Sequence, residues 1–372
     1  MRSTIAEIDL GAIAFNLEGV RQRVRPAATM AVVKADAYGH GILAVSRLAL
    51  QHGAEYLAVA LPDEAVQLRQ SGIEAPILVM GGLHRDDAHL YPHYDLEATV
   101  YEPGALTALK RAAKKLNHPV KVHVKVDTGM GRVGVDWRQA AAYTAALADE
   151  EAVQLSGLYM HFATADAIDK SYAQLQLARF NEVVSDLKDK KIKVPLVHAA
   201  NSAAIIDLPE SYFDMVRPGV MLYGYYPSKE TSESIPLQPA MTFKTRVLHA
   251  KTVERGQSVS YGRQFIASEP TQIITLPVGY ADGYNRLLSS RGEVLIRGRK
   301  YPIVGRVCMD MIMADTGPDG AIEVGEDAVL FGRQGDHEIT VQSICDLLGT
   351  IPYEVTCWVS RRVPRLYINE NR

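Results

Sequence analysis

The sequence has few cysteines, no excess of either charge and no long apolar run. Among its 372 residues are three cysteines and no Cys-x-x-Cys pair, so it predicts neither a disulfide framework nor a zinc site and suits a reducing cytoplasm. Forty basic and 43 acidic residues leave a net charge of −3, which offers no basic footprint for nucleic acid. No apolar run approaches the roughly 18 residues of a membrane-spanning helix. Glu7 and Asp9 interrupt the N-terminal stretch, unlike a secretory signal.

What is present is an ordinary globular composition, with 47% hydrophobic and 22% charged residues. From residue 30 to about 225, short apolar runs alternate with longer amphipathic stretches. The eight runs are MAVVKA, YLAVA, APILVMG, EATVY, VKVHVKVD, LSGLYMHF, VPLVHAA and VRPGVMLYG. Eight strands alternating with helices over this length predict an α/β fold, a TIM-type (β/α)8 barrel of parallel strands.

The pattern changes after about residue 235, where strands lie close together between glycine-rich turns. The segment SKETSESIP is typical of a boundary, so we expect a barrel domain at 1–235 and a mostly β domain at 236–372. Within the second domain, IRGRKY indicates a hairpin around Gly298 and TVQSICDLLGTIPYEV indicates a late helix.

Two lysines lie where a barrel enzyme is expected to hold its reactive groups, just past the C-terminal ends of strands. Lys34 follows a fully apolar run, so its stem should be buried and its ammonium should face the barrel mouth. Lys125 stands two residues after His123 and shares a strand face with it. A buried lysine loses its charge, reacts covalently or finds an acid. The alternatives are a Lys34 that reaches solvent and a Lys125 in an ordinary salt bridge.

The loop after VKVHVKVD contains Gly-x-Gly-x-x-Gly, formed by Gly129, Gly131 and Gly134. A dinucleotide site needs an acidic residue about 20 positions later, at the end of the next strand, but here that strand ends at His161. We therefore interpret the glycines as a tight turn over the barrel mouth. Arg132 within that turn can bind a substrate carboxylate with its forked guanidinium.

The segments after the last two barrel strands predict a phosphate site, a common feature of this position in barrels. The sixth strand ends at His161, the seventh leads to His198, Asn201 and Ser202, and the eighth leads to Arg217, Gly219 and Val220. Of these residues, Ser202, Gly219 and Val220 form the expected site. The stretch around Ser202 has the composition of a helix start, with side-chain and backbone donors. Gly219 allows its own N–H and that of Val220 to approach an anion closely.

Two further groups of residues are given structural interpretations. The histidines of HRDDAHLYPHYD do not predict a metal site, because Pro92 breaks the helical spacing of His89 and His93. We interpret that stretch, His84 included, as a solvated loop. Cys308 follows the apolar run PIVGRV and is interpreted as packed rather than reactive.

The stretch AVVKADAYGHG closely resembles the pyridoxal-phosphate motif of alanine racemases. Further stretches resemble the same family, in the expected order: HVKVDTGMGRVGV, GLYMHFATAD, HAANSAA, VRPGVMLYG, SVSYGR, LPVGYADGYNR, PIVGRVCMD, PYEV and RVPR. Together they span residues 31–365 and so cover both expected domains. The family's barrel and β domain (fold type III) agree with the pattern above.

The resemblance implies pyridoxal 5′-phosphate (PLP) as the cofactor and no metal. Lys34 would bind PLP covalently, Arg217 would contact its pyridine nitrogen and His161 would stack near its ring. The residues implied to hold the phosphate are Tyr38, Ser202, Gly219, Val220 and Tyr353.

The resemblance also assigns residues to the substrate. Arg132 and the backbone N–H of Met309 would bind its carboxylate. Lys125 matches a position that is carbamylated in relatives and would orient Arg132. The residues implied to form the entrance are Tyr280, Tyr353, Arg306, Asp166 and Ile351.

The implied activity is the interconversion of L-alanine and D-alanine, which would supply D-alanine for peptidoglycan in the cytoplasm. Lys34 would be the base for the D-enantiomer and Tyr261 the base for the L-enantiomer, with a Tyr261–His161–Arg217 hydrogen-bond chain lowering the pKa of the phenol. The protein would be a homodimer whose sites take Tyr261 from the partner chain, with no membrane or nucleic-acid partner.

Serine or several amino acids remain possible substrates. Two other classes fit the residues less well. A non-catalytic PLP-binding barrel would lack the β domain and Tyr261, and a decarboxylase would lack the carboxylate clamp at Arg132.

Overall fold

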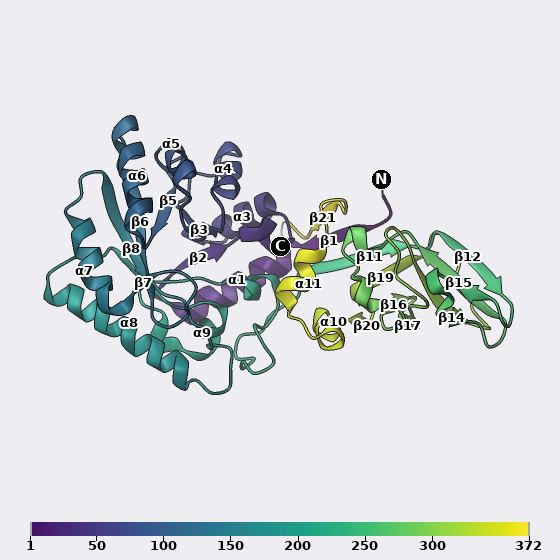
Figure 1. The fold of residues 1–372 in the computed structure, drawn as a ribbon. Coiled ribbons are helices and arrows are strands. Elements are labelled where there is room, and N and C mark those ends of the chain that lie inside the picture. Colours follow the sequence, from purple (N-terminus) through teal and green to yellow (C-terminus); the bar gives the residue numbers. More distant parts are fainter. Residues whose placement is uncertain (1, 371–372) are drawn as a thin grey trace. The chain divides into compact units, whose positions relative to one another are not determined.

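The computed structural model describes residues 2–370, which form two compact units. The barrel unit comprises Ile13–Ala37 and Gly41–Gln238. The β unit comprises the chain up to Ala12, the segment Tyr38–His40 and the chain from Pro239 onward. Figure 1 shows the helices and strands of each unit along the chain.

The barrel unit is built on eight parallel strands that run in the order β10-β2-β3-β4-β5-β6-β8-β9. Their bounds are β2 Ala28–Val32, β3 Tyr56–Val59, β4 Ile77–Val79, β5 Glu97–Val100, β6 Val120–Asp127, β8 Val153–Tyr159, β9 Leu196–His198 and β10 Met215–Val216. Two backbone hydrogen bonds join the ends of this order, from Asp214 N to Val197 O at 3.0 Å and from Arg217 N to Ala200 O at 2.9 Å. The predicted (β/α)8 barrel is therefore confirmed, and each of the eight apolar runs overlaps one strand.

Helices follow most of the strands, and they begin and end at residues that suit those positions (Figure 1). Glu102, Asp136 and Asn201 each accept a backbone N–H at a helix start. Asn117 ends one helix in the left-handed conformation, with φ of 50°. The bounds are α1 Leu10–Val24, α3 Ile42–Gln51, α4 Pro62–Gln70, α5 Leu90–His93, α6 Pro103–Leu116, α7 Trp137–Ala148, α8 Ser171–Asp189 and α9 Ser202–Asp207.

The last predicted strand run, VRPGVMLYG, is only partly extended, which corrects the sequence interpretation. Strand β10 ends at Val216, and a 3-10 turn occupies Val220–Tyr223. Pro218 has no N–H for a ladder, and Gly219 adopts φ of −117° and ψ of −101°, outside the strand region. The chain therefore leaves the barrel directly after β10.

The β unit contains a sheet in the order β17-β16-β19-β11-β1-β21, with β20 paired to β19. Its strands are β1 Ile5–Asp9, β11 Met241–Arg246, β16 Glu293–Ile296, β17 Arg299–Pro302, β19 Asp327–Gln334, β20 His337–Ile339 and β21 Arg365–Ile368. A second sheet joins β12 His249–Val253, β15 Thr271–Leu276 and β18 Ile312–Gly317, and a two-stranded ribbon joins β13 Ser258–Val259 to β14 Phe265–Ile266. The mostly β character predicted for this part of the chain is confirmed.

Of two local predictions in the β unit, the hairpin is confirmed and the single late helix is corrected. The hairpin around Gly298 is present between β16 and β17, with Arg297 and Gly298 at φ of 52° and 71°, as a type I′ turn requires. The late helix is instead two helices, α10 Val341–Leu348 and α11 Pro352–Trp358. Gly349 separates them with φ of 70°, a left-handed helix end.

The N-terminal strand was not recognised in the sequence. Strand β1 pairs with β11 antiparallel and with β21 parallel, so these first residues belong to the β unit although the sequence suggested a domain at 1–235. The domain boundary near 235 stays a prediction. No helix among residues 2–370 has the length and apolar character needed to cross a bilayer.

Candidate functional site

Lys34 begins a turn that few sequences adopt. It opens α2 (Lys34–Tyr38), in which Ala35, Asp36 and Ala37 all have φ of 53°. This is a left-handed helical turn, which costs roughly 1–2 kcal/mol per residue that has a Cβ. Side-chain acceptors hold it: Glu64 Oε1 takes the N–H of Ala35 at 2.6 Å, and Asp36 Oδ1 takes the N–H of Ile42 at 2.8 Å. The position of Lys34 after β2 is therefore fixed by its neighbours.

Glu64 has a larger role than its sequence position suggested. Besides Ala35, its carboxylate accepts the N–H groups of Ala60 at 2.9 Å and Leu61 at 3.1 Å, at the start of α4. One side chain thus connects the turn after Lys34 to the loop after β3. The only sequence signal was an acidic residue three positions into a helix, which usually means a cap.

Lys125 is deeply buried near the end of β6, with 3% of its surface exposed. Its ammonium lies 4.8 Å from the ring centroid of Tyr159, and no carboxylate of residues 2–370 forms a salt bridge with it. Burial, followed by the charges of Arg217 and Arg132, lowers the pKa of Lys125 to about 7. Lys121 on the same strand differs, because it pairs with Asp95 at 3.3 Å. The ordinary salt bridge considered for Lys125 is not observed.

Arg217, just after β10, is also buried, with 2% of its surface exposed. Its Nη2 donates to the carbonyls of Met160 at 2.8 Å and Ala199 at 2.9 Å, and its Nη1 donates to His198 Nδ1 at 3.0 Å. The guanidinium lies 5.3 Å from the Tyr159 ring, so Tyr159 contacts both buried cations. Burial lowers the pKa of Arg217 to about 10, which still leaves it charged at neutral pH. Its Nε makes no hydrogen bond with residues 2–370.

His161 follows β8, and its Nδ1 is buried without a hydrogen-bond partner among the described residues. Burial holds the pKa of His161 well below its usual value, and the charges of Arg217, Lys125, Arg132 and Lys34 act in the same direction. The imidazole is therefore neutral at pH 7. A buried polar atom without a partner is uncommon and indicates a contact that another group completes.

Two of the predicted phosphate ligands contact one another. Gly219 N donates to Ser202 Oγ at 2.8 Å, which brings the start of α9 to the start of the 3-10 turn at Val220. Asn201 caps α9 by accepting the N–H of Ala204 at 3.1 Å. The helix start predicted around Ser202 is thus confirmed.

The glycine-rich loop turns back on the end of β6, as the sequence analysis expected. Asp127 accepts the N–H groups of Gly129 at 2.9 Å and Gly131 at 3.1 Å. Gly134 has φ of 139°, and a Cβ there would lie 2.6 Å from Asp127 N. These glycines serve the turn, and the Arg132 side chain between them is exposed.

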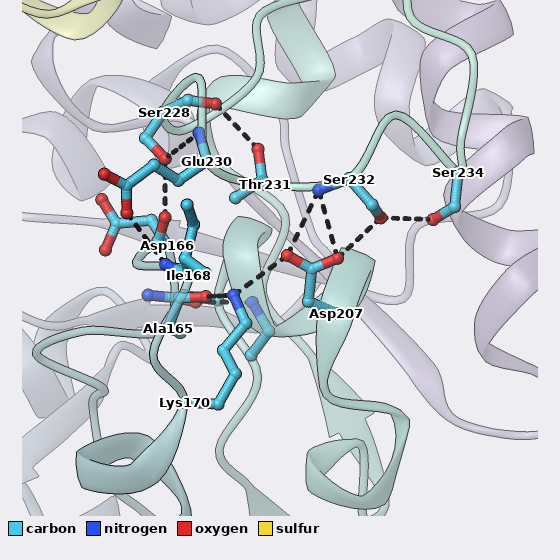
Figure 2. A network of polar contacts seen from close by, with 12 residues as sticks. Ala165, Asp166, Ile168, Lys170, Asp207, Ser228, Glu230, Thr231, Ser232 and Ser234 are labelled. Carbon is cyan, nitrogen blue, oxygen red and sulfur yellow. Dashed lines mark hydrogen bonds and ion pairs between the residues drawn. The ribbon is translucent and has the colours of Figure 1, made fainter.

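The loop after β8 carries Asp166, one of the expected entrance residues, and a second segment holds this loop (Figure 2). Ser228 Oγ donates to Asp166 O at 2.6 Å, and Glu230 Oε2 accepts the N–H of Ile168 at 2.8 Å. Lys170 pairs with Asp207 at 3.1 Å, and Asp207 also accepts the Ser232 hydroxyl at 2.6 Å. The stretch SKETSESIP, predicted as a domain boundary, is therefore hydrogen-bonded to the barrel unit.

The remaining predicted residues belong to the β unit, and several of them are exposed. The exposed fractions are 70% for Tyr261, 53% for Ile351, 52% for Met309 and 42% for Tyr280. Backbone hydrogen bonds place Tyr280 beside Cys308, with Tyr280 N donating to Cys308 O at 3.0 Å. Cys308 itself is half-buried.

Two pairs of predicted residues lie close together within the β unit. Ser260, next to Tyr261, exchanges hydrogen bonds with the backbone of Arg306 at 2.8 and 3.1 Å. The rings of Tyr38 and Tyr353 are 5.9 Å apart. Burial raises the pKa of the Tyr38 phenol, with a further contribution from Tyr353. The predicted residues are thus divided between the two units.

The sequence analysis did not identify three side chains whose contacts or burial the structure reveals. Tyr159 lies inside an apolar strand run, where an aromatic residue suggests only core packing. Glu97 is the first residue of the run EATVY and is 2% exposed. An acidic residue at the start of a strand gave no indication of such burial. Glu64 resembled a simple cap.

Comparison with known proteins places both parts of the chain in one family. Residues 8–227 match the description "Alanine racemase, N-terminal domain", and residues 240–367 match "Alanine racemase, C-terminal domain". A relative named alanine racemase, from Halothermothrix orenii, is 45% identical over 370 residues, which is 99% of this chain and 98% of the relative.

Solved structures agree with this match. An alanine racemase of Clostridium difficile 630 has a TM-score of 0.95 at 37% identity, covering 99% of this chain and 97% of that one. A histidine racemase of Leuconostoc mesenteroides has the same fold at greater distance, with a TM-score of 0.92 at 27% identity over 99% and 98% of the two chains.

Proposed function

We propose that this chain, which belongs to the alanine racemase family, interconverts L-alanine and D-alanine with bound PLP and supplies D-alanine for peptidoglycan. The observation that carries the proposal is Lys34, fixed after the first barrel strand by a left-handed turn. Its charge acts on Lys125 and His161, so the three side chains share one region of the barrel unit.

The side chains of this region fit an anionic cofactor with a ring. Lys125 and Arg217 are buried cations without a carboxylate in salt-bridge contact among residues 2–370. The buried Nδ1 of His161 lacks a partner within that range. Ser202 and Gly219 bring a hydroxyl group and a backbone turn together at 2.8 Å. Such donors suit a phosphate and a pyridine nitrogen.

We assign the cofactor contacts accordingly. Lys34 would hold PLP covalently, Arg217 would meet the pyridine nitrogen through Nε, and His161 would lie near the ring. The phosphate would be held by Ser202, Gly219, Val220, Tyr38 and Tyr353. When bound, PLP delocalises the negative charge that deprotonation leaves on the substrate Cα.

The protein must supply two bases, because racemisation removes the Cα proton from one face and returns a proton to the other. We assign the Lys34 amine to the D-enantiomer and the Tyr261 phenolate to the L-enantiomer. A phenol with the ordinary pKa near 10 costs about 4 kcal/mol to hold ionised at pH 7. The expected hydrogen-bond chain from Tyr261 through neutral His161 to Arg217 would lower that cost, but among residues 2–370 its His161–Arg217 link is not formed, since His161 Nδ1 has no hydrogen-bond partner there.

The substrate carboxylate is assigned to Arg132 and to the backbone N–H of Met309. Lys125 would be carbamylated, which turns a buried cation into an anion that orients Arg132. The depressed pKa of Lys125, about 7, supports this assignment, because only the neutral amine reacts with carbon dioxide. Tyr280, Arg306, Asp166 and Ile351 would line the entrance.

We further propose a homodimer in which each site receives Tyr261 from the partner subunit. The support is the exposure of Tyr261, Met309 and Ile351, each more than half exposed in the single chain. In a symmetric dimer each interface surface is used twice.

The test is reconstitution of the purified chain with PLP, followed by borohydride reduction and peptide mapping. The expected result is a visible absorbance band, cofactor fixed to Lys34, and racemisation of alanine faster than that of serine or histidine. Equal rates on several amino acids would favour a broad-specificity racemase, and a chain that binds no PLP would overturn the proposal.

A further inference from the structure

A continuous chain of four polar side chains crosses the interior of the barrel. Glu97 Oε2, on β5, lies 2.7 Å from His123 Nε2, on β6. His123 Nδ1 lies 3.0 Å from His198 Nε2, on β9, and His198 Nδ1 lies 3.0 Å from Arg217 Nη1. All four residues are at most 2% exposed, so water does not compete for these contacts.

The direction of every hydrogen bond in this chain follows from its arginine end. A guanidinium can only donate, so His198 Nδ1 must accept from Arg217. A neutral imidazole has one donor and one acceptor, and burial beside Arg217 holds the pKa of His198 well below its usual value. His198 therefore donates from Nε2 to His123, and His123 donates from Nε2 to Glu97. The carboxylate oxygen is the terminal acceptor.

Glu97 is also the acidic side chain that could balance this buried charge. Among residues 13–37 and 41–238 it is the one buried carboxylate, and Arg217 is a buried cation. The groups facing Glu97 from neighbouring elements are His123, the Tyr56 phenol and Arg69. Burial, followed by the charge of Glu97, raises the pKa of Tyr56 to about 12.

We propose that Glu97 is a positioning residue for Arg217, acting through His123 and His198. The relay fixes the rotation of the guanidinium, because Nη1 is committed to His198 while Nη2 is committed to two carbonyls. Nε is left as the donor for the cofactor. The inference rests on the proposed function only for that last contact, since the relay belongs to the chain itself.

The first test requires neither substrate nor cofactor. Nitrogen NMR of the full chain with labelled histidine, with and without PLP, reports the tautomer of each ring. At pH 7 both His123 and His198 should carry their proton on Nε2, as the hydrogen-bond directions require. An Nδ1–H tautomer or an imidazolium at His198 would overturn the relay. Correct tautomers in a protein that fails to racemise alanine would leave the relay standing and remove the proposed function.

The second test breaks the relay at its far end. Glu97→Gln should change the His198 Nδ1 chemical shift and lower kcat about tenfold, with KM changed less than twofold. In a His123→Gln background, where the relay is already broken, Glu97→Gln should have no further effect on kcat. Thr144→Val is the matched control, since it removes a buried hydrogen bond to Ala140 O within α7, which is not part of the relay. Additive effects of Glu97→Gln and His123→Gln would contradict the proposal.

Discussion

The predicted site residues of the two units differ most in their burial. In the barrel unit, Lys125 is 3% exposed, Arg217 2% and Ser202 4%. In the β unit, Tyr261 is 70% exposed and Met309 52%. The barrel residues are held by hydrogen bonds, ring contacts and a strained turn, whereas the side chains of Tyr261 and Met309 project from short turns.

This difference in burial predicts which substitutions change the stability of the protein as well as its activity. A buried polar side chain is part of the core, so its removal alters stability and chemistry together. An exposed side chain contributes little to the stability of the single chain. Substitutions of exposed residues such as Tyr261 should therefore change activity alone, and those of buried residues such as Lys125 and Arg217 should change both.

The largest effect is expected at Lys34. Lys34→Ala removes the proposed covalent attachment and one of the two bases, so racemisation should fall by at least about 10⁴-fold. The visible band of the cofactor should disappear as well. Racemisation assays and absorbance spectra measure this, with Lys121→Ala as the control because Lys121 lies on the surface beside Asp95. Full activity in Lys34→Ala would remove the proposed base.

The next largest effect on activity is expected at Tyr261, an exposed residue of the β unit. Tyr261→Phe removes only a hydroxyl, so the rate should fall by about 10² to 10⁴-fold, while the thermal midpoint stays within about 1 °C. The cofactor band should remain. A large loss of thermal stability in Tyr261→Phe would show that the residue is packed, contrary to its exposure in the single chain.

The same two residues can test whether sites are shared between chains. Co-expression of Lys34→Ala with Tyr261→Ala gives about half mixed dimers, each with one intact site, so roughly a quarter of wild-type activity should return. If Tyr261 acts within its own chain, every site stays defective and activity remains at the level of the single variants.

The fold could be predicted from the sequence because it repeats a simple pattern. Eight apolar runs each need a covering helix, and that requirement leaves few architectures. Strand β1 was missed because its five residues, IAEID, are short and half polar. They pair with strands that lie far away in the sequence, at 241–246 and 365–368. No local signal reports such a pairing.

The site was predictable to the extent that its residues stand in short motifs. Lys34 and Arg217 both lie at strand ends, where position alone made them candidates. Glu64 and Glu97 act across strands on groups 29 and 26 positions away. Their contacts depend on the register of the closed barrel, which the sequence pattern does not set.

A fourth prediction concerns the buried charge of Lys125. Lys125→Met should lower kcat about 10²-fold, because Arg132 loses its orienting partner, and chloride or acetate should restore part of the rate. A lysine in the unfolded chain keeps its proton up to about pH 10.5, whereas the folded one loses it near 7. Wild-type stability therefore rises with pH between these values.

The stability gain of Lys125→Met follows from the same shift. It should be largest below pH 7 and should be about 3 kcal/mol smaller at pH 9 than at pH 6. Urea titrations in buffer free of carbon dioxide measure the difference. Added bicarbonate should reduce this pH dependence if Lys125 is carbamylated, and an unchanged dependence would contradict that modification.

A smaller effect is expected where a carboxylate supports the turn after Lys34. In Glu64→Gln one of the two acceptor oxygens becomes an amide donor, which faces the N–H groups of Ala35 or of Ala60 and Leu61. We expect a loss of about 1–3 kcal/mol in stability and about a tenfold fall in kcat. Asp63→Asn, on the exposed side of the same helix start, should change neither quantity.

The smallest effect is expected at the segment that holds the Asp166 loop (Figure 2). Ser232→Ala removes the hydroxyl contact to Asp207, but the N–H of Ser232 still reaches that carboxylate at 3.3 Å and Lys170 still pairs with it at 3.1 Å. Because Ser232 is exposed, the loss in stability should be below about 1 kcal/mol, and kcat should stay within twofold. Urea titration and alanine racemisation measure the two quantities, with Ser234→Ala as the control. A tenfold fall in kcat would contradict this prediction. It would mean that catalysis requires the Asp166 loop to be held in place by this surface segment.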